Sequence, residues 1–156
     1  MVDTTKRSKG IWFYGLSGSG KSFASSICKK FIPNAFVVDG DDVRKYISMD
    51  LSYSESDRKV QIKRILGISK IVMKNNMFPI ISTVTMQSDL LIECNKLQIE
   101  VVLLNRPMDQ IHQVREIYKN ESNVVGKDIF LQKFDTRILT NDGTINFNKR
   151  LRDLFG

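Results

Sequence analysis

A glycine-rich stretch near the N-terminus, residues 15–22, constrains this chain more than any other feature. It reads Gly-Leu-Ser-Gly-Ser-Gly-Lys-Ser and fits the spacing G-x-x-x-x-G-K-S. Residues 11–14 before it form a short apolar and aromatic run that is typical of a strand. Strand, glycine loop and helix are the context in which this pattern binds phosphate. A helix after the loop is indicated by apolar residues at helical spacing: Phe23, Ala24, Ile27, Cys28 and Phe31.

The chemistry of a phosphate site explains the fixed positions of this loop. Glycines allow successive backbone N–H groups to turn inward around an anion without Cβ clashes. The helix that follows directs its positive N-terminal end at the same anion. Lys21 is expected to reach the β- and γ-phosphates, and the hydroxyl of Ser22 to bind Mg²⁺. The alternative is a glycine-rich turn without a ligand, but four matched positions between a strand and a helix favour nucleotide binding.

Length and composition indicate one globular domain, residues 1–156. Of the 156 residues, 42% are hydrophobic and 26% are charged, and a chain of this length buries a substantial core. No apolar run approaches the roughly 20 residues of a membrane span. Residues 1–9 are polar and basic without the apolar core of a signal peptide, and we expect them to form a flexible arm.

The two cysteines, Cys28 and Cys94, provide neither a disulfide framework nor a metal site. We expect Cys28 to be a buried core thiol, and the protein to be cytoplasmic without a membrane partner. The net charge of +7 has two explanations, a nucleic-acid surface or clusters that bind small anionic substrates. Because the basic residues are scattered over several elements, we favour small anions and expect no nucleic-acid partner.

The rest of the chain alternates between strand and helix patterns. Ser54 is expected to cap a long helix that reaches about Asn75. The alternation predicts an α/β fold with a mostly parallel sheet of about five strands, helices on both faces and an active site at the carboxyl ends of the strands. Strands are predicted at 35–38, 78–84, 99–104 and 137–139, further helices at 43–48, 88–95, 107–118 and 147–155, and a mobile loop at 119–135. The buried stripe of the long helix is expected to contain Val60, Ile62, Ile65, Leu66, Ile68, Ile71 and Val72.

A second group of charged residues follows the second predicted strand. It reads Asp39-Gly40-Asp41-Asp42-Val43-Arg44 and lies at the same edge of the predicted sheet as the glycine loop. A carboxylate at this place orders Mg²⁺ through water or accepts the proton of an attacking hydroxyl. An acidic turn that only caps the next helix is the alternative, and the position beside the phosphate loop favours the chemical role.

The order of these segments resembles the adenylylsulfate (APS) kinase family. The resemblance rests on residues 15–22, on residues 39–44 as the family's DGDNxR segment, and on Leu51-Ser52-Tyr53-Ser54 as its LGFS-like stretch. Asp57-Arg58 and then Val60-Gln61-Ile62-Lys63-Arg64 correspond to its DR and ENIRR helix. The resemblance covers about residues 10–84 and implies a P-loop kinase fold with three layers and a mobile lid at about 119–135. It also implies a homodimer.

By this resemblance, ATP donates its γ-phosphoryl group to the ribose 3′-hydroxyl of a nucleotide, with Asp41 as the catalytic base and Lys21 on the phosphates. The acceptor nucleotide is expected to be held by Arg44, Arg58 and Gln61 beside a stacking surface on Tyr53. Lys127 is expected to join this acceptor site when the lid closes. Since no aspartate ends the third strand, Asp39 or Asp41 is left to order Mg²⁺ through water, together with Ser22. The ATP site is expected to comprise Gly15, Leu16, Ser17, Gly18, Ser19, Gly20, Lys21, Ser22 and Phe23.

Departures from the family lie in the acceptor pocket and the lid. Residues 82–87, beginning with Ser82 and Thr83 of the expected pocket, replace an ISP-type motif, and residues 127–130 replace a lid stretch whose phenylalanine covers the acceptor base. We therefore predict another 5′-activated nucleotide as acceptor and prefer cytidine diphosphoramidate, the substrate of APS-kinase-like enzymes of bacterial capsule biosynthesis. A genuine APS kinase is the alternative.

Other classes of nucleotide-binding protein fit less well. A regulatory GTPase requires an N-K-x-D guanine reader and a D-x-x-G switch, and the chain has no N-K-x-D and no suitably placed switch. Another small-molecule kinase stays open, because P-loop kinases share a fold and differ in the pocket. A nucleotide-binding module without enzymatic activity is the third class.

Overall fold

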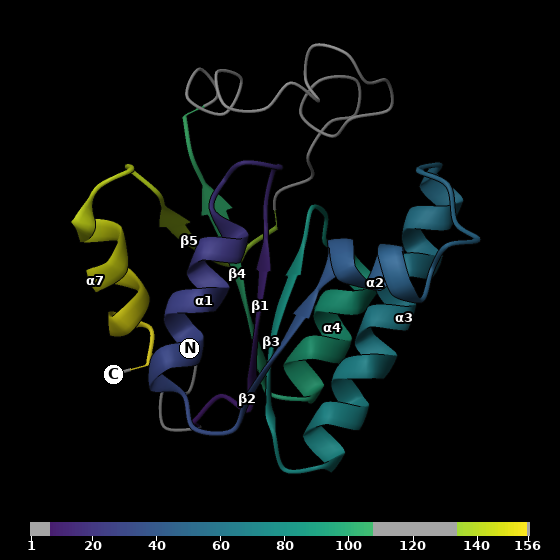
Figure 1. Ribbon diagram of the computed structural model, residues 1–156, viewed down its shortest axis with the longest axis horizontal. Coiled ribbons are helices and arrows are strands. Elements are labelled where there is room, and N and C mark those ends of the chain that lie inside the picture. The colour runs from purple at the N-terminus through teal and green to yellow at the C-terminus, as the bar shows by residue number, and fades with distance from the viewer. Residues whose placement is uncertain (1–6, 108–133, 156) are drawn as a thin grey trace.

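The computed structural model describes residues 7–107 and 134–155, which form an α/β fold of three layers (Figure 1). A five-stranded sheet is the middle layer, and helices pack against both of its faces. All strand pairs are parallel. The predicted fold class is therefore confirmed.

The strands lie in the order β2-β3-β1-β4-β5. The chain runs from the central β1 to the β2 edge, returns to β3, and then crosses to β4 on the other side of β1. Ligand crevices of open α/β sheets lie where the order reverses in this way, at the carboxyl ends of the strands. The strands are β1 Gly10–Tyr14, β2 Ala35–Asp39, β3 Phe78–Thr83, β4 Ile99–Asn105 and β5 Arg137–Thr140.

Alternation along β1 divides the core between the two faces of the sheet. Ile11 and Phe13 belong to the cluster formed with α1 and α7, whereas Trp12 and Tyr14 belong to the cluster formed with α2, α3 and α4. Because both faces are covered, every residue of β1 is buried, as is usual for a central parallel strand. The helices are α1 Lys21–Phe31, α2 Gly40–Tyr46, α3 Glu55–Lys74, α4 Ser88–Lys96 and α7 Ile145–Asp153.

Helix caps explain where the predicted boundaries hold and where they are wrong. Ser54 caps α3 as predicted, since its side chain accepts a hydrogen bond from Asp57 N. Helix α2 begins at Gly40, three positions before the predicted start, because the Asp39 carboxylate accepts from Asp41 N and caps it. Helix α7 begins two positions early for the same reason, with Thr144 as the cap.

The buried stripe of α3 is narrower than predicted. Val60 is 39% exposed and Ile71 is 64% exposed, so these two residues do not belong to it. Gln61 and Ser69 are buried instead. At 3.6 residues per turn, positions 60 and 71 lie on the flank of the helix that turns away from the sheet. Hydrophobicity without regard to helical phase produced this error.

The start of the chain joins the fold earlier than predicted. Lys9 N donates to Gln98 O at 2.9 Å, and Ser8 Oγ donates to a Glu100 carboxylate oxygen at 3.2 Å. Residues 8 and 9 are therefore fixed beside β4, so the prediction of an arm through residue 9 is wrong for these two positions.

Several predictions lie outside the described residues: the helix at 107–118 beyond Pro107, lid residues 119–133, and Lys127. Among the residues that the structure describes, no helix is long and apolar enough to cross a membrane.

Candidate active site

The glycine loop lies at the carboxyl end of β1, where the strand order reverses, and leads directly into α1. At two positions of the loop, Gly15 and Gly20, neighbouring atoms leave no space for a side chain. A Cβ on Gly15 would lie 2.5 Å from Leu104 O, and a Cβ on Gly20 would lie 2.5 Å from the Asn141 Nδ2 atom. Gly20 also has φ +102°, a left-handed conformation that side chains disfavour. The loop therefore fits closely against the carboxyl ends of β4 and β5.

Contacts within the loop give it a compact shape. Ser19 N donates to Leu16 O at 3.0 Å, which closes a turn. The Lys21 Nζ atom donates to Gly15 O at 2.6 Å and to Leu16 O at 2.9 Å, so the ammonium group is held by the loop itself. Helix α1 has Gly20 at its N-cap and no side-chain cap. The first N–H groups of α1 therefore remain directed at the loop, as an anion site requires.

Two residues from distant parts of the chain support the tip of the loop, and neither was predicted from the sequence. Arg106, just after β4, donates from NH1 to Gly18 O at 3.1 Å. Asn141, just after β5, donates from Nδ2 to Ser19 O at 3.0 Å. The signal that could have found them is their position, since a polar residue that directly follows a parallel strand lies at the active-site edge.

Ser22 and Asp39, the two residues predicted to hold Mg²⁺, lie in contact beside the loop. The Ser22 hydroxyl donates to one Asp39 carboxylate oxygen at 3.4 Å, and the other oxygen accepts from Asp41 N at 2.8 Å. Hydroxyl and carboxylate oxygens are suitable partners for Mg²⁺ and for its bound waters. Asp39 thus links the phosphate loop to the start of α2, where Asp41 is exposed. No group of three potential metal-ligating side chains occurs within the described ranges, so a metal here would depend on phosphate and water oxygens.

The predicted acceptor residues Arg44, Tyr53 and Arg58 lie together. The guanidinium carbons of Arg44 and Arg58 lie 4.2 Å and 5.5 Å from the centre of the Tyr53 ring. Arg58 Nε also donates to Tyr53 O at 2.8 Å. Burial, followed by the nearby positive charge of Arg44, lowers the pKa of Arg58 below its ordinary value. Two guanidinium groups that repel each other beside a 58% exposed aromatic ring favour a planar, negatively charged ligand.

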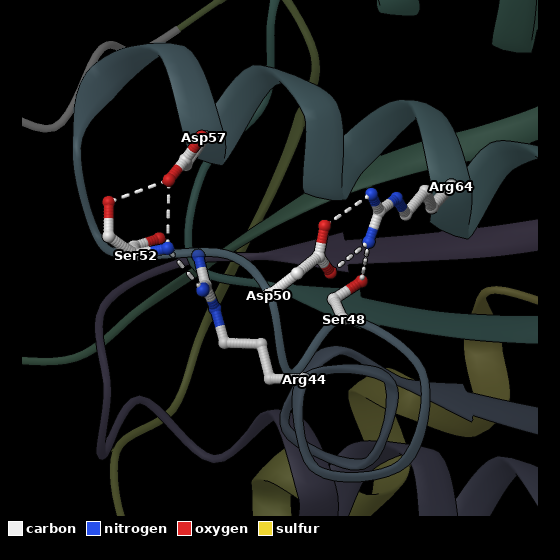
Figure 2. Close-up of polar contacts among 6 residues, drawn as sticks. All are labelled: Arg44, Ser48, Asp50, Ser52, Asp57 and Arg64. Carbon is white, nitrogen blue, oxygen red and sulfur yellow. Dashed lines mark hydrogen bonds and ion pairs between the residues drawn. The ribbon is translucent and has the colours of Figure 1, made fainter.

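A network of polar side chains holds the segment between α2 and α3 (Figure 2). Arg64 forms a bidentate ion pair with Asp50 at 2.7 and 2.9 Å. Asp57 accepts from both Ser52 N and Ser52 Oγ, and Arg44 NH1 donates to Ser52 O at 3.0 Å. These hydrogen bonds lower the pKa of the Asp50 and Asp57 carboxyl groups below their ordinary value. The network therefore fixes the backbone on either side of Tyr53.

Gln61, Ser82 and Thr83, also predicted for the acceptor pocket, are buried. Gln61 Nε2 donates to Gly40 O at 3.1 Å, whereas its Oε1 atom is buried without a hydrogen-bond partner within the described structure. The Thr83 hydroxyl accepts from Trp12 Nε1 at 2.8 Å and donates to Thr85 O at 2.7 Å. Thr83 therefore has a structural role that the sequence did not indicate.

Phe23, predicted as part of the ATP site, packs against the C-terminal helix. Its ring is half exposed and stacks on Phe147 of α7, with ring centres 6.0 Å apart. This contact joins the first turn of α1 to the C-terminal helix. A role of Phe23 in ATP binding stays a prediction.

The parallel sheet with a glycine-rich loop after its central strand defines a P-loop kinase fold. The structure resembles the APS kinase of Mycobacterium tuberculosis in complex with AMPPNP and APS, with a TM-score of 0.81, 21% identity and 95% coverage of each chain. It also resembles a gluconokinase from Sinorhizobium meliloti, with a TM-score of 0.60, 13% identity, and coverage of 96% of this chain and 95% of that one. At these identities the likeness concerns the fold.

Sequence comparison specifies the family. Residues 7–123 match the family model of adenylylsulphate kinase, and the chain belongs to this family. The adenylyl-sulfate kinase of Pseudomonas aeruginosa is 35% identical over 79 residues, which cover 48% of this chain and 40% of that relative. The enzyme of the same name from Bacteroides thetaiotaomicron is 29% identical over 128 residues, 80% of this chain and 50% of the relative. The chain thus spans half or less of the length of these relatives.

Proposed function

We propose that the protein is an ATP-dependent kinase that transfers the γ-phosphoryl group to the ribose 3′-hydroxyl of a 5′-activated nucleotide. The observation that carries this proposal is the arrangement around Asp39. This side chain links the Ser22 end of the phosphate loop to the α2 residues that precede Arg44. The helix that Asp39 caps also carries Arg44 of the cationic acceptor site, and this arrangement suits direct transfer between two nucleotides. Family membership supports the same reaction.

In the proposed reaction, the 3′-oxygen attacks the γ-phosphorus while Asp41 accepts the hydroxyl proton. The bond from the γ-phosphorus to the β–γ bridging oxygen breaks, and ADP leaves. Lys21 and the N–H groups at the start of α1 stabilise the charge on the phosphoryl oxygens. A bound Mg²⁺ would neutralise charge between the β- and γ-phosphates, and Ser22 and Asp39 are the residues that would hold it.

For the acceptor we prefer cytidine diphosphoramidate, and adenylylsulfate is the alternative. The preference rests on the sequence departures in residues 82–87 and 127–130, because a smaller pyrimidine tolerates the loss of a lid aromatic. The alternative is equally compatible with the family model and with the curated relatives. Arg44 and Arg58 beside Tyr53 suit either nucleotide, since both carry a 5′-anionic group and a planar base.

The experiment is a direct comparison of the two acceptors. The purified protein is incubated with Mg-ATP and each nucleotide, and ADP release and ³¹P spectra are recorded. The preferred proposal requires a new 3′-phosphate signal with cytidine diphosphoramidate. Rapid turnover of adenylylsulfate without any turnover of the cytidine compound would instead identify the protein as an APS kinase. A lack of turnover with either acceptor would contradict the proposed reaction.

Asp41→Asn distinguishes an enzyme from a nucleotide-binding module. General-base catalysis contributes about 10²- to 10⁴-fold, so turnover should fall by that amount while Mg-ATP still binds with unchanged affinity. Asp42→Asn is the matched control, since it removes the neighbouring exposed carboxylate of the same helix. Equal loss of activity in both variants would contradict the assignment to Asp41.

We also propose a homodimer and a cytoplasmic location. A structural neighbour from Thiobacillus denitrificans is a hexameric APS kinase, which supports self-association in the fold family without specifying the number of subunits. The described cysteines, Cys28 and Cys94, are free and buried, and burial raises the pKa of both thiols to about 12. Light scattering tests the dimer, and cell fractionation tests the location.

A further inference from the structure

Asn141 is a buried polar residue that no catalytic role explains. It directly follows β5 and is 7% exposed. Its backbone N donates to Asn105 O at 2.7 Å, which joins it to the end of β4. Its Oδ1 atom accepts from Gly143 N at 2.9 Å, and its Nδ2 atom donates to Ser19 O at 3.0 Å. One side chain thus connects the β5–α7 turn to the tip of the phosphate loop.

The contact with Ser19 fixes the orientation of a particular peptide group. In a planar trans peptide, the carbonyl of one residue and the N–H of the next point in opposite directions. Because Asn141 holds the Ser19 carbonyl toward β5, the Gly20 N–H points away from β5. The preceding N–H, that of Ser19, is used in the turn with Leu16 O. Gly20 therefore supplies the last loop N–H before α1, and Asn141 sets its direction.

The Asn141 amide packs closely against the loop at Gly20. A Cβ on Gly20 would lie 2.5 Å from Asn141 Nδ2 and 3.6 Å from the Phe147 ring. Phe147 is itself 2% exposed and stacks on Phe23, in the first turn of α1. The Asn141 side chain is therefore held between the loop and the β5–α7 turn, and a change of rotamer would break its hydrogen bonds to both.

We propose that Asn141 is a positioning residue of the phosphate loop, which holds the Ser19–Gly20 peptide so that the Gly20 N–H faces the bound phosphates. The proposal rests on the proposed function in one respect, namely that the loop binds a triphosphate. Through Asn141, the β5–α7 turn contributes to the affinity for the phosphates without contacting the base.

The test uses a base-free ligand, inorganic triphosphate with Mg²⁺, and compares it with Mg-ATP by calorimetry. Asn141→Ala should weaken binding of both ligands about three- to tenfold, the range expected for one hydrogen bond. Asn141→Asp keeps the acceptor for Gly143 N but turns a carboxylate oxygen toward the Ser19 carbonyl, so it should weaken binding further. The matched control is Asn75→Ala, which removes an equivalent bond from Asn75 Nδ2 to Ile71 O at the exposed end of α3.

Amide NMR spectra of the ligand-free protein separate this inference from the proposed function. In Asn141→Ala, the Gly20 and Lys21 amide resonances should shift and their hydrogen exchange should accelerate several-fold, whereas Asn75→Ala should leave them unchanged. Wild-type affinity for triphosphate in Asn141→Ala, or unchanged Gly20 and Lys21 amides, would overturn the inference. A wild-type protein that binds neither ligand while Gly20 still responds would contradict the proposed function alone. Melting curves of each variant ensure that binding is measured on folded protein.

Discussion

The phosphate loop and the acceptor side of the site are held in place by different kinds of contact. Residues 15–22 are fixed by packing against strand ends and by side chains 88 and 122 positions away, Arg106 and Asn141. The acceptor side is fixed mainly by side chains within residues 44–64, most of them exposed or partly exposed (Figure 2). The donor loop is thus joined to the strand ends of the sheet by long-range contacts, whereas the acceptor side is a local network on the surface.

This difference indicates how readily the phosphate loop and the acceptor side can each tolerate substitutions. A change in the loop disturbs buried strand ends, where small shifts in packing are costly. A change in the surface network alters charges that are already solvated, and such pairs contribute little to the stability of the whole domain. The acceptor side can therefore be altered with little loss of stability.

Of the changes that test the contrast between the two regions, the one on the donor side should have the largest effect. Lys21→Ala removes the ammonium group that is expected on the transferred phosphates, and loss of one such stabilising group costs about 10²- to 10³-fold in kcat. Acceptor affinity should stay unchanged, because the Lys21 ammonium group donates to Gly15 O and Leu16 O within the donor loop itself. Steady-state kinetics with both substrates varied provide the measurement. Lys29→Ala at the exposed end of α1 is the control, and equal losses in both variants would contradict the assignment.

Next in size is the removal of one guanidinium from the acceptor side. Arg58→Ala should raise the KM for the acceptor about tenfold or more, since hydrogen bonds to charged groups contribute about 1.5–3 kcal/mol. The KM for ATP should not change. Lys59→Ala is a matched control from the same turn of α3, where Lys59 forms an exposed pair with Glu55 at 3.7 Å. A change in ATP affinity in Arg58→Ala would mean that the two halves are not separable.

A smaller effect concerns the response to acid. The pKa values of Asp50 and Asp57 are lowered in the folded protein, by hydrogen bonds from Arg64 and Ser52 respectively. Their stabilisation is therefore present above the unfolded value of about 3.9 and is lost as the pH falls through the lower folded values. Urea denaturation at about pH 5 and at about pH 3 should show less loss of stability in the double variant Asp50→Asn/Asp57→Asn than in the wild type. An identical pH dependence would contradict the assigned contacts.

The smallest expected effect is a gain in stability that leaves both substrates unaffected. Gly67 lies exposed within α3, and a Cβ added there meets nothing within 4 Å. Gly67→Ala should therefore stabilise the protein by about 0.5–1 kcal/mol, because glycine is unfavourable inside a helix. Denaturant unfolding measures the gain, and kinetics should show unchanged KM values. A changed acceptor KM would indicate that α3 must flex for the acceptor to bind.

Much of the fold was predictable from sequence because its signals are local. Continuous apolar runs marked the buried parallel strands, and Ser54 marked the start of α3. The errors arose where a cap or a helical phase decides the outcome, as at Gly40 and at the exposed Ile71. Thr83 was assigned to the acceptor pocket because it falls where the APS kinase family has its ISP-type motif, and only the hydrogen bonds of its hydroxyl to Trp12 and Thr85 revealed the structural role.

The sequence by itself determined the phosphate loop, the α/β class and the family, because each depends on residue types at short, fixed spacing. Only the tertiary structure decided which distant side chains support that loop. Arg106 and Asn141 follow separate strands, and no spacing in the sequence relates either of them to Gly18 or Ser19. They meet because parallel strands bring their carboxyl ends to one edge of the sheet, where each carbonyl of a tightly turned loop needs a partner.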